Sequence, residues 1–262
     1  MKKTVVALLI GSIILAPLCA GGNKEKAMSA KKTEIMISAA ASLTNCIQDL
    51  SAMYTEKNPQ VTITANFGSS GALQQQIEQG APADVFFSAG IKQMNALKEK
   101  GMMIDSSVKN ILENKVVLIT PKNAAALDFF EDLTGDFVKK IGVGEPKSVP
   151  VGQYTEQIFQ NLGLTDKVAS KLIFAKDVRE VLSWVETGNV DAGVVYETDA
   201  KISKDVTICS TAPEGSHKQV IYPIGVVKAS KHAAEAQKFV DFLFSDAAKE
   251  VFVRYGFTVI SK

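Results

Sequence analysis

VTITANFGSSGALQQQI, residues 61–77, places a strand, a short turn and a helix in immediate succession. Apolar residues alternate with polar ones as far as Phe67, which is the pattern of a strand with one apolar face. A glycine-serine turn at 68–71 follows, and Leu73 and Ile77 then recur at helical spacing. This stretch therefore predicts a strand that runs directly into a helix.

The same order of strand and helix continues on both sides of that stretch. Upstream we expect a strand at 34–38 and a helix ending before Pro59; downstream we expect a strand at 84–88 and a helix ending at Gly101. Alternating strands and helices are typical of an α/β fold with parallel strands. Further strands are predicted at Lys115–Thr120, Lys140–Val143, Leu172–Ala175, Ala192–Tyr196 and Val206–Cys209, with helices opened by Pro150 and Asp177.

The composition limits the classes of function. The chain has 262 residues, 46% of them hydrophobic, and 29 basic side chains against 28 acidic ones. That length supports one large domain or two smaller ones, and that composition excludes a disordered chain. Lys and Arg alternate with Asp and Glu along the sequence, which argues against nucleic acid as a partner. We therefore expect a small-molecule ligand.

The first residues have the features of an export signal. A positive start at 1–3 precedes an apolar run at 5–18, which is too short to span a bilayer comfortably. We expect a signal peptide at 1–20 and a polar tether at 21–32. Either cleavage follows Ala20, or Cys19 is acylated as the first residue of a lipoprotein. The predicted location is the periplasm, or the outer face of the membrane through a lipid anchor and no other membrane contact.

The remaining cysteines and the histidines do not favour a metal site. Cys46 and Cys209 are far apart in sequence, and His217 and His232 are the only histidines. Metal sites use shorter ligand spacings. The two cysteines are best interpreted as small buried apolar residues, although a disulfide between them is left open. No cofactor is expected.

Four predicted helices begin with residues that leave backbone N–H groups accessible. Ser42, Ser70, Val151 and Val178 stand at these helix starts. The first N–H groups of a helix have no partner within it and carry partial positive charge, so several that converge can hold an anion without Lys or Arg. Each start alone is explained by ordinary helix capping. As a set, they predict an anion site at the carboxyl ends of the strands.

Several motifs then resemble, in order and spacing, the substrate-binding protein of bacterial molybdate ABC transporters. The resemblance covers the chain beyond the signal peptide. It implies a two-lobed type II periplasmic binding protein, each lobe a mixed, mostly parallel sheet flanked by helices. Lobe I would comprise 33–115 and 221–262, lobe II 116–220, with the ligand in the cleft between them. The motifs are AAASLT (39–44), GSSG (68–71), GAPADVF (80–86), PVGQY (150–154), DVR (177–179), GVVY (193–196) and RYGF (254–257).

The same resemblance implies the ligand and its contacts. Ser42 and Ser70 would donate hydroxyl and backbone N–H groups, Val151 and Val178 backbone N–H groups, and Tyr196 its hydroxyl. The ligand would be molybdate or tungstate, bound through its oxygens with no direct ligation of the metal. The protein would be a monomer without enzymatic activity that delivers the anion to permease subunits.

Two alternatives stay open. The same fold could bind sulfate, thiosulfate or a small organic anion. A serine hydrolase is the rival from another class, because GSSGA at 68–72 is close to a G-x-S-x-G nucleophile motif and Asp199 and His217 follow in the required order. No glycine-rich oxyanion segment precedes that motif, which weakens the hydrolase alternative.

Overall fold

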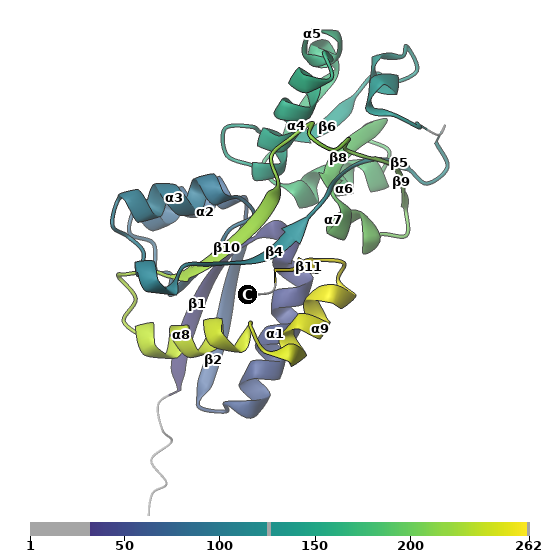
Figure 1. Ribbon diagram of the computed structural model, residues 1–262. Helices are drawn as coiled ribbons and strands as arrows, with labels where there is room; N and C mark the ends of the chain where they lie inside the picture. The colour runs from purple at the N-terminus through teal and green to yellow at the C-terminus, as the bar shows by residue number, and fades with distance from the viewer. Residues whose placement is uncertain (1–31, 125–126, 261–262) are drawn as a thin grey trace, which may run out of the picture. The chain divides into compact units, whose positions relative to one another are not determined.

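Two β-sheets organise the computed structural model, which describes residues 32–124 and 127–260 (Figure 1). The first sheet has the strand order β11-β4-β10-β3-β1-β2 and the second the order β7-β6-β8-β5-β9. Helices flank both sheets, so the fold is α/β with two lobes. The predicted fold class is confirmed in this respect.

The strands and helices have the following bounds. The strands are β1 (Thr33–Ala40), β2 (Val61–Gly68), β3 (Val85–Phe87), β4 (Lys109–Asn114), β5 (Val116–Pro121), β6 (Ile141–Gly144), β7 (Leu172–Ala175), β8 (Ala192–Tyr196), β9 (Val206–Thr211), β10 (Val220–Val226) and β11 (Thr258–Val259). The α-helices are α1 (Thr44–Lys57), α2 (Ser70–Glu78), α3 (Ile91–Glu99), α4 (Pro150–Asn161), α5 (Thr165–Val168), α6 (Val178–Glu186), α7 (Glu197–Lys201), α8 (Ala233–Phe242) and α9 (Asp246–Arg254). Short 3-10 turns are η1 (Ala41–Leu43), η2 (Asp105–Ser107), η3 (Phe130–Thr134) and η4 (Ala169–Lys171).

Strand register aligns the ends of neighbouring strands. β1 is parallel to β2 with Ala40 opposite Gly68, so η1 and the turn before α2 leave the first sheet side by side. In the second sheet β6 is parallel to β7 with Gly144 opposite Ala175, and it is also parallel to β8. Each lobe therefore gathers the starts of its helices at one edge of its sheet.

Both sheets are mixed, and most strands of each run in one direction, as predicted: these are β1, β2, β3 and β4 in the first sheet and β6, β7, β8 and β9 in the second. β10 runs antiparallel to β3 and β4, and β5 runs antiparallel to β8 and β9. The reason is the path of the chain: β4 ends at Asn114, and after Lys115 alone the chain enters the second sheet as β5. A strand that arrives from the other lobe enters at the edge where neighbouring strands end, and must run the opposite way.

Strand β4 was not predicted from the sequence. Its residues are mostly polar, and only Ile111 and Leu112 are buried.

The predicted lobe boundaries stay a prediction. The predicted signal peptide at 1–20, with Cys19, and the tether as far as residue 31 lie outside the described residues.

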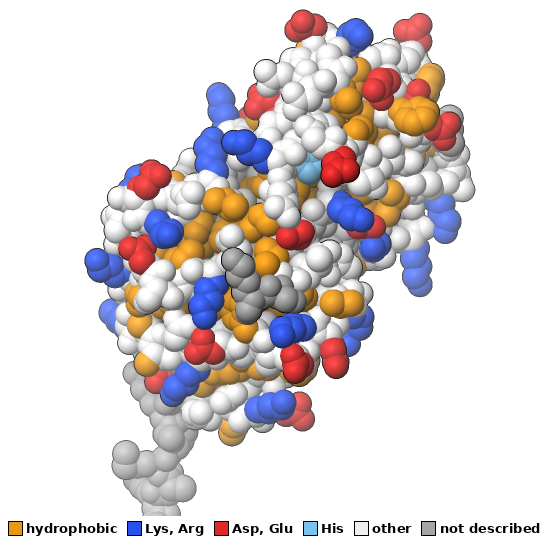
Figure 2. All heavy atoms as spheres, in the orientation of Figure 1, with side chains coloured by type: hydrophobic (Ala, Val, Ile, Leu, Met, Phe, Trp, Pro, Cys, Tyr) orange, Lys and Arg blue, Asp and Glu red, His pale blue; other side chains and the backbone are white. Residues whose placement is uncertain are grey.

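Charges of both signs are interspersed over the face in Figure 2. In the described part of the chain, no helix combines the length and the apolar character that crossing a membrane requires. Cys46 and Cys209 are free thiols. Among the residues that the structure describes, no three His, Cys, Asp or Glu side chains gather as metal ligands.

Candidate functional site

One small cavity is lined by all five residues that the resemblance predicts as ligands. Ser42, Ser70, Val151, Val178 and Tyr196 line it together, and each is buried. The cavity volume is about 10 Å³, close to the space that one water-sized group needs. The structure thus brings every predicted site residue around one small space. Their role as ligands stays a prediction.

Three of these residues lie in the first turn of a helix, where backbone N–H groups have no partner within the helix. Ser70 is the first residue of α2, and Val178 is the first residue of α6. Val151 follows Pro150 at the start of α4. Because helix starts also carry partial positive charge, the three form a neutral donor set that favours an anion.

The carboxylate of Asp177 lines the same cavity but caps its own helix. Its Oδ1 accepts the N–H groups of Arg179 and Glu180 at 2.9 and 3.0 Å. The N–H of Val178 is not used by this cap, so it is left for a ligand. Among the described residues that line the cavity, none is Lys or Arg.

The hydroxyl of Ser70 is held as a donor. Its Oγ accepts the backbone N–H of Ala89 at 2.9 Å, within the buried interior. A serine hydroxyl has a single proton, and the partner at Ala89 supplies a proton of its own. The proton of Ser70 is therefore available to the cavity.

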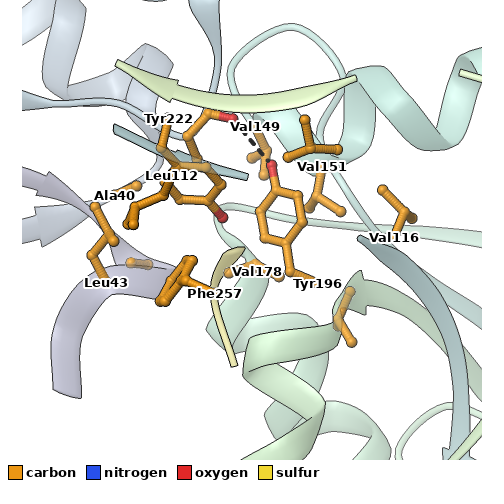
Figure 3. Close-up of a cluster of buried hydrophobic side chains, with 14 of the residues drawn as sticks. Ala40, Leu43, Leu112, Val116, Val149, Val151, Val178, Tyr196, Tyr222 and Phe257 are labelled. Carbon is orange, nitrogen blue, oxygen red and sulfur yellow. Dashed lines mark hydrogen bonds between the residues drawn. The ribbon is translucent and has the colours of Figure 1, made fainter. Parts of the chain in front are cut away.

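Tyr196 ends β8 and reaches across to the first lobe. Its hydroxyl donates to the backbone carbonyl of Ala89, which follows β3, at 3.4 Å (Figure 3). The ring packs edge-on against Tyr222, with 5.7 Å between the ring centroids. Burial raises the pKa of Tyr196 well above its ordinary value of 10.0. The phenol therefore stays protonated, as a hydrogen-bond donor must.

Two further contacts close the lobes around the cavity. The N–H of Gly71 at the start of α2 donates to the carbonyl of Ser148, in the loop that follows β6, at 2.9 Å. Arg179 Nη2, on α6, donates to Asn45 Oδ1, on α1, at 2.9 Å. These contacts join the segments that carry the two sheets, and the arrangement that they hold is referred to below as the closed form.

Arg179 also forms an ion pair with the fully buried Asp199. Burial raises the pKa of Asp199 from 3.8 to about 6, and the charge of Arg179 opposes this shift. Arg179 directly follows Val178, and Asp199 lies on α7, directly after β8. The pair therefore connects the two chain segments that supply Val178 and Tyr196.

The serine hydrolase alternative requires Ser70, His217 and Asp199 in one hydrogen-bonded chain. Instead, Asp199 faces Arg179, and His217 Nδ1 contacts the carbonyl of Lys218 at 2.7 Å. Ser70 accepts from a backbone N–H. The contacts of the described residues do not assemble the triad.

We expect Asp199→Asn to remove a pH dependence of folding. Since the pKa of Asp199 is higher in the folded state, this group stabilises the fold most below about pH 4, and the stabilisation is lost as the pH rises through about 6. The unfolding free energy of the wild type, relative to the variant, should fall by about 3 kcal/mol across that window. Urea unfolding between about pH 4 and pH 7, without ligand, measures this. Parallel curves for the two proteins would show that Asp199 does not titrate there.

Sequence reasoning missed two residues of a hydrogen-bond chain that leads to Ser42. Tyr222 Oη lies 3.0 Å from Ser42 Oγ, and Asn114 Nδ2 lies 3.1 Å from the same Tyr222 oxygen. Asn114 is a polar residue at the carboxyl end of a strand, a signal that could have indicated it. No sequence signal distinguishes Tyr222 from other residues of a buried strand.

A family model for bacterial extracellular solute-binding proteins matches residues 35–258. The chain belongs to this family. The resemblance seen in the motifs is thereby confirmed, and with it an extracytoplasmic solute-binding role. The family is defined by binding a solute rather than by catalysis.

Relatives of this solute-binding protein cover nearly its whole length. YvgL of Bacillus subtilis, provisionally named as an ABC transporter substrate-binding lipoprotein, is 42% identical over 98% of this chain and 98% of its own. The molybdate-binding protein ModA of Haemophilus influenzae is 39% identical over 94% of this chain and 97% of its own. The periplasmic molybdate-binding protein of Azotobacter vinelandii superposes with a TM-score of 0.78 at 22% identity, covering 87% of this chain and 100% of that structure. This last likeness shows the shared fold.

Proposed function

We propose that this solute-binding protein captures molybdate, and also tungstate, and delivers the anion to the permease subunits of an ABC transporter. The observation that carries the proposal is the convergence of hydrogen-bond donors from five chain segments on one cavity whose described lining contains no Lys or Arg. Burying a dianion is costly unless its oxygens are hydrogen-bonded, and these donors supply such bonds. The names of relatives such as ModA of Haemophilus influenzae add support.

A cavity of donors also selects the protonation state of its ligand. Molybdate, tungstate and sulfate carry no proton at neutral pH, so every oxygen can accept. Hydrogen phosphate carries a proton that needs an acceptor, and an unpaired buried polar group is costly. Sulfate, a smaller anion, is therefore the closest competitor, and fixed donors would discriminate against it by size.

Calorimetry of the purified protein with molybdate, tungstate, sulfate and phosphate tests the proposal. We expect tight binding of molybdate and tungstate at one site per chain, far weaker binding of sulfate, and no measurable binding of phosphate. Equal affinity for sulfate would contradict the proposal and favour the sulfate alternative.

Tyr196→Phe should speed the release of molybdate. The variant keeps the ring and its packing against Tyr222 but removes the hydroxyl, whose one proton would turn from the Ala89 carbonyl to the bound anion. We expect an off-rate about 10-fold or more above that of the wild type, because a bond to a charged acceptor is lost in the closed state. Stopped-flow release measures the rate. An unchanged off-rate with a lowered melting temperature would make Tyr196 a packing residue only.

We propose further that the protein is a monomeric lipoprotein anchored through Cys19. The lipoprotein name of the YvgL relative supports this anchor. Labelled palmitate supplied to expressing cells should enter the wild type and not Cys19→Ser. Equal labelling of both proteins would contradict the anchor at this position.

A further inference from the structure

Hydrogen bonds fix the orientation of the Asn114 amide. Its Oδ1 accepts the backbone N–H of Lys115 at 2.9 Å, which identifies the carbonyl side of the amide. The opposite side, Nδ2, donates to Thr198 Oγ1 at 2.8 Å and to Tyr222 Oη at 3.1 Å. Both amide protons are thus used, and Asn114 can act toward Tyr222 only as a donor.

This amide determines where the proton of Tyr222 goes. Tyr222 is fully buried, and its oxygen accepts from Asn114. Its proton is then directed to its other polar neighbour, Ser42 Oγ, at 3.0 Å. Burial raises the pKa of Tyr222 well above 10.0, so the phenol keeps this proton.

The Ser42 hydroxyl, like that of Ser70, is left with its proton free to donate, but a different partner brings this about. Ser70 accepts from the backbone N–H of Ala89, a donor that cannot reverse. Ser42 accepts from a hydroxyl, which can reverse unless another group fixes it. Resting on the proposed function, we infer that Asn114 and Tyr222 are positioning residues that hold the Ser42 hydroxyl as a donor to the bound oxyanion.

Neither positioning residue lines the cavity. Their effect on the anion passes through Ser42, so it must vanish when the Ser42 hydroxyl is absent. The two residues also prevent Ser42 from accepting a proton from a protonated anion. The Ser42 oxygen already accepts the hydroxyl proton of Tyr222. Loss of the phenol frees that oxygen to accept a proton from hydrogen phosphate.

A double-mutant cycle with Ser42→Ala and Tyr222→Phe, read by molybdate calorimetry, tests the inference. Each single variant should bind about 10-fold or more weakly, the effect of losing or misdirecting one bond to a charged acceptor. The double variant should bind no more weakly than Ser42→Ala. Losses that multiply would overturn the inference, because Tyr222 would then act through packing or closure.

Tyr222→Phe should also narrow the preference for molybdate over phosphate. An unchanged preference would count against the inference.

Tyr255→Phe is the matched control. It also loses a phenol hydrogen bond, to Asp49 at 2.8 Å, away from the cavity, and should keep wild-type affinity.

If Tyr222→Phe does not fold, Asn114→Ala replaces it in the cycle, with Thr198→Val as the variant that loses only the other Asn114 contact. Asn114→Ala should weaken binding more than Thr198→Val, and equal effects would overturn the inference. A wild type that binds no molybdate would overturn the proposed function and this inference with it, whereas tight wild-type binding with multiplying losses would overturn the inference alone.

Discussion

Gly71→Ala should lose tight molybdate binding while the protein without ligand stays folded. A Cβ at this position would lie 2.4 Å from the carbonyl oxygen of Ser148 and 2.7 Å from its Cα. These are backbone atoms of the other lobe, which cannot rotate away, so the variant cannot reach the closed form. Alanine is the better helix former by about 1 kcal/mol, so α2 itself gains stability. We expect molybdate affinity to fall by about 100-fold or more.

Gly90→Ala provides the comparison. A Cβ there would meet side-chain atoms, Gln93 Oε1 at 2.7 Å and Pro150 Cβ at 3.2 Å. Because a glutamine side chain can move, the loss in affinity should be much smaller than for Gly71→Ala. Calorimetry gives both affinities and a melting curve without ligand gives the stability. Wild-type affinity in Gly71→Ala would mean that this closed arrangement is not required for binding.

Val178→Pro should remove one anion contact without unfolding α6. Val178 is the first helical residue, the position that proline tolerates best, and Asp177 before it is extended, with φ −158° and ψ 173°. The substitution deletes the N–H expected to face the anion and leaves an oxygen without a partner. The dissociation constant for molybdate should rise by about 100-fold.

Val178→Ala separates the lost N–H from the lost side chain. It keeps the backbone donor and removes buried methyl groups, so it should lower the melting temperature and leave the affinity near that of the wild type. If the alanine and proline variants bound molybdate equally well, the N–H of Val178 would not be a ligand. Circular dichroism of both variants checks that the helix content is kept.

The helix starts were predictable because their signals are local. Ser70 and Val178 were placed correctly from capping residues and apolar spacing within a few positions. The parallel pairs of the sheets also followed from the alternation of strands and helices. The predictable part of the site is thus the part encoded by short stretches of chain.

The remaining features depend on contacts between distant segments. The antiparallel strands arise from the path of the chain between lobes, which no local pattern encodes. Gly71 is the second residue of α2. It must be glycine because a Cβ there would meet the backbone of Ser148, 77 positions later. The bond between Ser42 and Tyr222 spans 180 positions. Such contacts between distant residues are set by the three-dimensional arrangement and cannot be predicted from a single sequence.

Five predicted ligand residues from separated segments would give the bound anion a mechanical role. An anion bound to all of them is a noncovalent cross-link between lobes, and it is present only in the native state. At a free concentration 1,000 times its dissociation constant, a ligand adds about 4 kcal/mol to the free energy of unfolding. The loaded protein should therefore melt at a higher temperature and resist proteases for longer than the unloaded one. Outside the cell, its lifetime would then depend on how much anion the surroundings contain.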